Sequence, residues 1–311
     1  FKEDPGDKVI LRYDENGAPS YSFHSLLHDL DEHIRMMDES GIDAAVLSCA
    51  QGMCGDLDVS KFINDKMKEA EKRYPGRFIG TAHAHPLGGK DAFREMARCK
   101  DMGYPGIVIT SEINGVWLDD PVLDPFWAEA QRLGLFVFVH PALNLSYSKQ
   151  FDAYDMARSI GREFSLVMAT VRLINGGVLD RFPQLNVQMA HLSGGIASVL
   201  GRVRSYQDKD FWGTKGNPRH GALPEHDFDH YIEKRLVFDT AGFCGAISSV
   251  KASLVELPQA RIVFGTDYPQ EIRQRSVVHD FVKELKAMGG AGGAILQGNT
   301  RLLLGEVGRA A

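Results

Sequence analysis

The chain has 311 residues, of which 44% are apolar, and its formal net charge is −6 at pH 7, so it lacks the basic balance of a nucleic-acid-binding protein. Its length and apolar content allow a large core, and one α/β barrel of about 250 residues would account for most of it. No apolar run approaches the roughly 20 residues that cross a bilayer, and the four cysteines form no CxxC pair, which favours reduced thiols in a cytoplasmic protein.

The first 40 residues divide into a polar segment and a helix. Residues 1–22 are polar and contain two turn dipeptides, so we expect an irregular insertion there, either a small hairpin or a loop. Apolar residues at helical spacing predict a helix over residues 24–40, and Gly41 supplies its C-terminal stop. We expect the histidines of this stretch to lie on its solvated face; they are His24, His28 and His33.

Short apolar runs then alternate with helical patterns. The runs begin near residues 44, 77, 106, 135, 187, 235 and 261. Helices are predicted over 60–73, 90–102, 124–133, 151–176, 196–206, 247–255, 276–288 and 295–304. This alternation argues for parallel strands joined by right-handed crossovers. We therefore predict an α/β protein of one domain spanning residues 1–311, with a long loop at 207–227 of a kind typical of lids or subunit contacts.

Seven predicted strands are one fewer than a closed (β/α)8 barrel requires. Residue 44 already lies deep in a β/α unit, so the absent strand should be the first one. We expect it either upstream of the given sequence or disguised within residues 1–22. The predicted architecture is a TIM barrel whose first strand is missing from the given sequence.

Three of the apolar runs end in a side chain that binds metals or carries protons. His140 ends the run near residue 135, His191 ends the run near 187, and Asp267 follows the run near 261. In α/β barrels the carboxyl ends of the strands meet at the face where the chemistry lies. A single histidine at a strand end is often only a core residue, but imidazole and carboxylate together are ligands for zinc or manganese. Three such residues on separate strands indicate a metal-dependent active site.

His83 and His85 form an HxH pair whose side chains would point to the same side of a strand. The pair follows the second visible strand, and if it opened the barrel the strand near residue 44 would have no place. We therefore expect these histidines to line the pocket or the core, with His85 contacting substrate rather than a metal ion.

Five motifs lie at the ends of predicted strands and in the helices that follow them. They are Val139-His140-Pro141, Ala190-His191-Leu192-Ser193-Gly194-Gly195, Gly201-Arg202, Phe264-Gly265-Thr266-Asp267-Tyr268-Pro269 and Gly298-Asn299-Thr300-Arg301-Leu302-Leu303. Together they resemble the amidohydrolase-2 group, in its branch related to aminocarboxymuconate-semialdehyde decarboxylase. The resemblance implies a distorted TIM barrel with one divalent ion, zinc or alternatively manganese, bound by His140 and Asp267. It also implies that His191 is the catalytic acid/base, with Asp267 as the other residue that could handle the proton.

The chain departs from this family at its start, where the HxH or ExH of strand one is absent; we expect that a leading segment is missing from the given sequence. The resemblance gives roles to two arginines. Arg202 matches an arginine that reaches into the neighbouring subunit's site and binds a substrate carboxylate, which implies a homodimer or a higher homo-oligomer. Arg172 resembles an arginine of the aromatic-acid decarboxylases, and a guanidinium fork suits a substrate carboxylate.

The strand-end residues and the resemblance predict a carbon–carbon lyase. We expect a metal-dependent, non-oxidative decarboxylase of a small aromatic or dienoic carboxylic acid. One alternative is a metal-dependent hydrolase that opens a lactone or a cyclic amide with metal-bound hydroxide. Another is a metal-free barrel without catalysis, kept for binding or assembly. The sequence does not identify the substrate.

Overall fold

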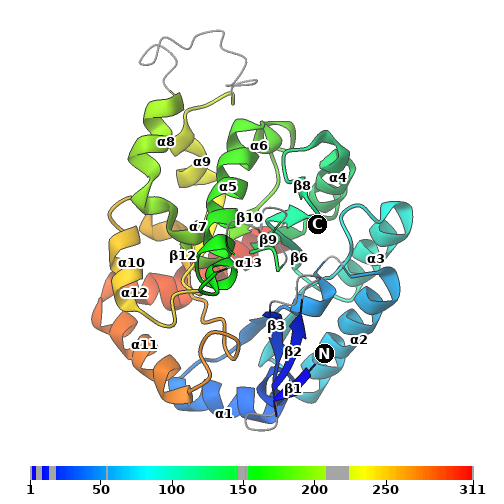
Figure 1. Cartoon of the computed structure of the whole chain (residues 1–311), viewed down its shortest axis with the longest axis vertical. Coiled ribbons are helices and arrows are strands. Elements are labelled where there is room, and N and C mark those ends of the chain that lie inside the picture. The colour runs from blue at the N-terminus through cyan, green and yellow to red at the C-terminus, as the bar shows by residue number, and fades with distance from the viewer. Residues whose placement is uncertain are drawn as a thin grey trace.

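The computed structural model describes most of the chain (Figure 1). For residues up to 23 and beyond 304 it describes the backbone alone. The described residues are 2–4, 9–13, 19–53, 55–143, 145, 151, 153–207 and 224–309. Most of the predicted loop at 207–227 therefore lies outside the described residues.

In the described part of the chain, seven parallel strands follow one another in chain order. Five of them form one sheet in the order β12-β11-β10-β9-β6, and β4 pairs with β5. A bridge between Ala82 and Ile107 joins the β4-β5 pair to β6. The strands are β4 (Ala45–Leu47), β5 (Phe78–Gly80), β6 (Gly106–Thr110), β9 (Phe136–His140), β10 (Val187–Met189), β11 (Leu236–Asp239) and β12 (Ile262–Val263). The predicted α/β barrel with parallel strands is confirmed.

The barrel wall is open between its first and last strands. Among the described residues, β4 pairs only with β5 and β12 only with β11. Backbone pairing also rules out one of the two predicted positions of the absent strand. β1 (Lys2–Asp4), β2 (Val9–Tyr13) and β3 (Pro19–Phe23) form a separate antiparallel sheet, which corresponds to the hairpin alternative for residues 1–22. An upstream first strand stays a prediction.

Helices surround the strands (Figure 1). They are α1 (Leu30–Ser40), α2 (Leu57–Arg73), α3 (Gly89–Asp101), α4 (Asp124–Leu133), α5 (Arg162–Asn175), α6 (Val178–Arg181), α7 (His191–Gly195), α8 (Leu200–Gln207), α9 (Phe228–Lys234), α10 (Ile247–Ser253), α11 (Arg275–Ala287), α12 (Gly290–Gly293) and α13 (Asn299–Arg309). The helix predicted over 151–176 begins later, with a π-helical turn at Ala157–Gly161 before α5. A short hairpin that the sequence analysis did not predict, β7 (Glu112–Ile113) with β8 (Val116–Trp117), follows β6. Within the described residues, no helix has both the length and the apolar character needed to cross a bilayer.

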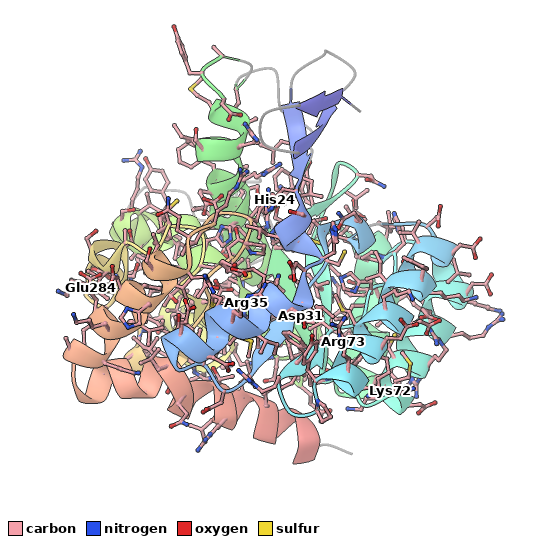
Figure 2. The ribbon with its side chains drawn as sticks, turned by 90° about the horizontal axis from the view of Figure 1, so that it is seen from below. His24, Asp31, Arg35, Lys72, Arg73 and Glu284 are labelled. Carbon is pink, nitrogen blue, oxygen red and sulfur yellow. The ribbon has the colours of Figure 1, made fainter. Side chains whose placement is uncertain are left out.

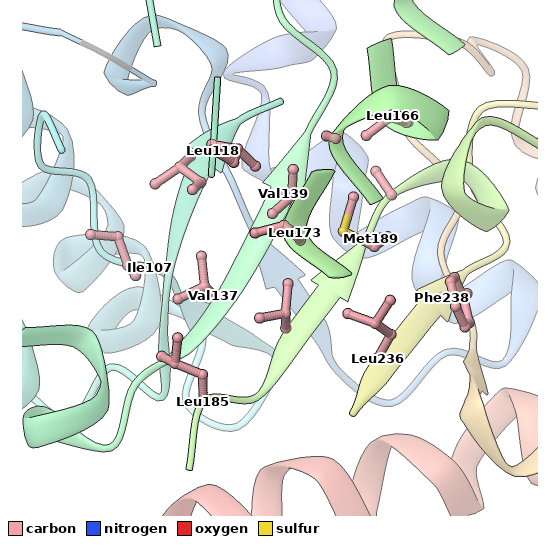
Figure 3. Close-up of a cluster of buried hydrophobic side chains, with 14 of the residues drawn as sticks. Ile107, Leu118, Val137, Val139, Leu166, Leu173, Leu185, Met189, Leu236 and Phe238 are labelled. Carbon is pink, nitrogen blue, oxygen red and sulfur yellow. The ribbon is translucent and has the colours of Figure 1, made fainter. Parts of the chain in front are cut away.

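The main core fills the space between strands and helices (Figure 3). Val137 and Met189 of the sheet pack with Leu166 and Leu173 of α5, and all four side chains are 0% exposed. Strands buried on both sides read as continuous apolar runs, which is why the sequence pattern located them.

A second core holds the ring of helices together at the open side of the wall. Met37 of α1, Phe78 of β5 and Val278 of α11 belong to it, and α1 packs along α11. At the surface of this region, Asp31 of α1 pairs with Arg73 of α2 at 2.8 Å (Figure 2). The helical ring therefore closes across the gap that the described strands leave open.

The expectation that the histidines near α1 lie on a solvated face is wrong for two of the three. His24 is 7% exposed and His33 is 9% exposed, whereas His28 is exposed. The ring of His33 lies 5.3 Å from that of Tyr268, and its Nε2 contacts the carbonyl oxygen of Leu26 at 3.0 Å. The second core covers the side of α1 that carries His33, because Phe78 and Tyr268 pack against its ring. The predicted stop at Gly41 is confirmed, with a left-handed φ of 70°.

Candidate active site

One large cavity occupies the interior of the barrel. Its volume is about 1910 Å³, and it extends from the carboxyl ends of the strands to the opening between β12 and β4. The apolar side chains in its wall include Leu47 of β4, Phe138 of β9 and Val263 of β12. Three of the residues singled out from the sequence, His140, His191 and Asp267, line this same cavity.

His140 ends β9 and has one ring nitrogen free to face a ligand. Its Nδ1 donates to the carbonyl oxygen of Pro141 at 2.8 Å, so Nε2 carries the lone pair. Burial lowers the pKa of His140 to about 3, and the charges of His191 and Arg162 add to this effect. A neutral imidazole oriented by a carbonyl is the form that binds metal ions.

His191 begins a turn with a left-handed backbone. The φ values run from 55° at His191 through 50° at Leu192 and 56° at Ser193 to 65° and 76° at the two glycines that follow. This conformation is unfavourable for residues with a Cβ. The structure holds it in two ways: Asp239 Oδ1 accepts from the backbone N–H of His191 at 3.0 Å, and the Ser193 and Thr170 hydroxyls lie 2.5 Å apart. The turn lifts the His191 ring off the strand and into the cavity.

The His191 ring lies between two other site residues. Its centroid is 6.0 Å from that of His140, in an edge-to-face arrangement. On the other side its Nδ1 donates to Glu163 Oε1 at 2.8 Å. Burial lowers the pKa of His191, but the carboxylates of Glu163, Asp267 and Asp239 outweigh burial and raise it to about 9. His191 is thus held in its protonated form at neutral pH.

Glu163 is a site residue that the sequence analysis missed. It stands in the first turn of α5, 28 residues before His191, and no strand end or motif marks it. The only local signal is Gly194. A Cβ at that position would lie 2.0 Å from the backbone oxygen of Glu163, which shows how closely α5 approaches the turn.

Asp267 follows β12 with a φ of 52°, an uncommon conformation that tends to be concentrated at functional sites. Burial raises the pKa of its carboxyl to about 7; the His191 charge opposes this, while Glu271, Asp239 and Glu163 reinforce it. Around His191, the three carboxyl groups of Glu163, Asp239 and Asp267 therefore face a single imidazole. A divalent cation bound between Asp267 and the lone pair of His140 would supply the lacking charge.

His140 and Asp267 are suitable types of metal ligand, but two ligands are fewer than a protein metal site usually has. Across the part of the chain that the structure describes, no three His, Cys, Asp or Glu side chains form a complete ion-binding group. His140 and Asp267 are the two candidates that the resemblance indicated. They supply one nitrogen and one carboxylate, a donor set suited to zinc or manganese.

The three predicted substrate contacts, Arg172, His85 and Arg202, do not line this chain's cavity. Arg172 Nε donates to Asp119 Oδ1 at 2.6 Å, and its guanidinium lies 5.2 Å from the Trp117 ring. Packing of α5 turns this side chain toward the outside of the barrel.

His85 and Arg202 are likewise engaged elsewhere. His85 Nδ1 accepts from the N–H of Leu87 at 3.1 Å, because the segment after β5 turns away from the barrel axis. Arg202 is exposed on α8 and donates to the Tyr206 hydroxyl at 3.1 Å. Its expected contact in a neighbouring subunit stays a prediction. His83, the other half of the HxH pair, is 0% exposed and accepts from the N–H of Cys49 at 3.0 Å.

A parallel α/β barrel with two histidines and a carboxylate at the mouth of its cavity defines a class of barrel enzymes whose chemistry lies at the carboxyl ends of the strands. The model of the amidohydrolase family matches residues 31–277. The chain belongs to the amidohydrolase family.

Two curated relatives are decarboxylases by name. The chain is 28% identical over 254 residues to the 2-amino-3-carboxymuconate-6-semialdehyde decarboxylase of Dictyostelium discoideum, covering 78% of this chain and 67% of the relative. It is 28% identical over 268 residues to the γ-resorcylate decarboxylase of Rhizobium radiobacter, covering 80% and 79%. The resemblance to this branch is confirmed.

A solved structure shares the fold. The dihydroxybenzoic acid decarboxylase of a Polaromonas species, with bound manganese and the inhibitor 2-nitroresorcinol, superposes with a TM-score of 0.76 at 22% identity. The superposition covers 88% of this chain and 85% of the other.

Proposed function

We propose that this chain is a metal-dependent, non-oxidative decarboxylase of a small aromatic or dienoic carboxylic acid. The observation that carries the proposal is the convergence of His140, His191 and Asp267 on one cavity. The relatives support it, because both are named for the decarboxylation of small unsaturated carboxylic acids.

The ion would be held by Nε2 of His140 and the carboxylate of Asp267. When bound, it would act as a Lewis acid on the oxygens of the substrate. We propose zinc, with manganese as the alternative; manganese is present in the Polaromonas structure. Metal analysis of the purified protein distinguishes the two.

His191 would supply the proton. As the bond between the ring carbon and the carboxyl carbon breaks, its electron pair stays on the ring carbon and carbon dioxide leaves. The Nε2–H of His191 then protonates that carbon, and solvent returns the proton to the imidazole. The hydrogen bond from Nδ1 to Glu163 orients this donor.

Product analysis tests the proposal. We expect the metal-loaded protein to release carbon dioxide from γ-resorcylate or from aminocarboxymuconate semialdehyde, with one deuterium incorporated in D2O. His191→Gln should retain the metal and lose at least ~100-fold in kcat, as expected when a general acid is removed. Ring opening of a lactone or cyclic amide with uptake of water, and no carbon dioxide, would instead favour the hydrolase alternative.

The metal-free alternative is tested in the same preparation. Substoichiometric metal after growth with abundant zinc and manganese, together with no turnover, would favour a barrel kept for binding or assembly. A further proposal concerns assembly: we propose a homo-oligomer in which the exposed Arg202 reaches a neighbouring cavity. Sedimentation of the purified protein checks the oligomeric state.

A further inference from the structure

We propose that Glu163 is the positioning residue of His191: its carboxylate fixes the imidazole with Nδ1 protonated and presents Nε2 to the cavity. The catalytic consequence rests on the proposed decarboxylase function. The orientation of the ring does not, because it is a property of the free protein.

The hydrogen bond defines which ring nitrogen faces the substrate. Glu163 Oε1 lies 2.8 Å from His191 Nδ1. A carboxylate only accepts hydrogen bonds, so Nδ1 must carry the proton. The remaining nitrogen, Nε2, then faces away from Glu163. A histidine held in this way by a carboxylate keeps a single tautomer and a single ring orientation.

Glu163 has no other described partner that would account for its burial. Its Oε2 is buried and makes no hydrogen bond within the part of the chain that the structure describes. The side chain is 16% exposed. A buried carboxylate is costly unless it is paired, and His191 is the partner at hand. The hydrogen bond to His191 is therefore the contact that accounts for the position of this carboxylate inside the barrel.

The backbone of His191 is held separately, by another acid. Asp239 Oδ1 accepts from the N–H groups of His191 and Ala241, and its Oδ2 accepts from Gln188. Asp239 thus fixes the strained turn, while Glu163 fixes the ring. This division makes the two roles separable by mutation.

Close packing leaves the ring little freedom to turn. A Cβ at Gly242 would lie 2.1 Å from His191 Cγ, so the backbone of the loop after β11 covers the ring. A Cβ at Gly194 would lie 2.0 Å from the Glu163 carbonyl oxygen. Because both positions are glycines, α5, the turn and the loop can approach one another directly around His191.

The test combines kinetics with a spectroscopic signal. In Glu163→Gln we expect kcat to fall about 100-fold with KM changed less than about threefold, since a misplaced acid harms the transition state more than substrate binding. Glu163→Asp should recover part of kcat. In histidine-labelled wild-type protein without substrate, we expect a downfield Nδ1–H proton, assigned by its loss in His191→Gln. It should shift upfield in Glu163→Gln, whose neutral amide oxygen accepts a weaker hydrogen bond, and disappear in Glu163→Ala.

The control is Glu129→Gln on α4, whose carboxylate pairs with Arg132 at 2.6 Å outside the cavity. It should leave both kcat and the proton signal unchanged. Unaltered kcat and signal in Glu163→Gln would overturn the proposal, as would a change in KM alone, which would make Glu163 a substrate contact. If Glu163→Gln fails to fold, the absence of the Nδ1–H signal from wild-type protein overturns it. Because that signal needs no substrate, it separates this proposal from the proposed function.

Discussion

The buried histidines of this barrel differ in how their surroundings shift their pKa, and at His83 the shift affects stability. It is 0% exposed, and its Nε2 accepts from the backbone N–H of Cys49. Burial lowers its pKa to about 4. Between about pH 4 and 6.5 the His83 imidazole is therefore neutral in the folded protein, whereas it is protonated in the unfolded chain, whose histidines titrate near pH 6.5.

A pH-dependent stability follows for His83. Because its folded pKa lies below the unfolded value, its contribution is present above about pH 6.5 and is lost as pH falls toward 4. We expect the free energy of unfolding to drop by about 2 kcal/mol more in wild type than in His83→Gln between pH 7 and 5. Urea unfolding at both pH values measures this, with the exposed His279→Gln as the control. An equal drop in wild type and His83→Gln would contradict the prediction.

Gly194 offers a second prediction at the residue scale. Gly194→Ala would place a Cβ 2.0 Å from a backbone oxygen of α5, so backbone must shift, and we expect a loss of roughly 3 kcal/mol. Gly195→Ala is the matched control: its φ is also left-handed, at 76°, but its Cβ would meet only Phe243 at 3.7 Å. It should cost about 1 kcal/mol, the strain term alone. Equal losses in the two variants would show that the close approach is unimportant.

At the scale of elements, the seam between α1 and α11 decides whether the ring of helices closes. Met37 is 0% exposed at the centre of the second core. Met37→Ala should therefore cost about 2–5 kcal/mol of unfolding free energy, as cavity-forming substitutions do. Arg35→Ala, whose side chain is 53% exposed on the same helix, should cost less than about 1 kcal/mol. Thermal and urea unfolding measure the loss of unfolding free energy in both variants. A similar loss in both would show that packing at this seam contributes little to stability.

The whole molecule adds a property that no single element has: three carboxyl groups from different elements, Glu163, Asp239 and Asp267, surround the imidazole of His191 inside one cavity. A divalent ion should therefore stabilise the folded chain, by about 2.7 kcal/mol at a concentration 100 times its Kd. We expect zinc or manganese to raise the Tm of wild-type protein and to raise that of His140→Ala much less. Scanning calorimetry with and without chelator measures the difference. An identical shift in both proteins would place the ion elsewhere.

Much of the barrel could be predicted from local pattern. Strands covered on both faces must be apolar throughout, so β6, β9 and β10 stand out in the sequence. A side chain that ends such a strand necessarily lies at one rim of the barrel. For that reason His140 and His191 could be placed at the same cavity before any coordinates were known.

Side chains on helices were less predictable. Arg172 and Glu163 stand nine positions apart on α5, yet one pairs with Asp119 outside the cavity and the other with His191 within it. Which face of a helix meets the barrel depends on packing against its neighbours, and polar residues carry little periodic signal. The burial of His24 and His33 escaped prediction for the same reason.

The sequence by itself determined the alternation of strands and helices and the residues that end each strand, because burial and strand geometry act over a few neighbouring positions. Only the tertiary structure decided that Glu163 holds His191, since that contact joins residues 28 positions apart through the approach of α5 to a glycine turn. Long-range contacts of this kind depend on how whole helices and strands pack, and the pattern of a short stretch of sequence does not predict that packing.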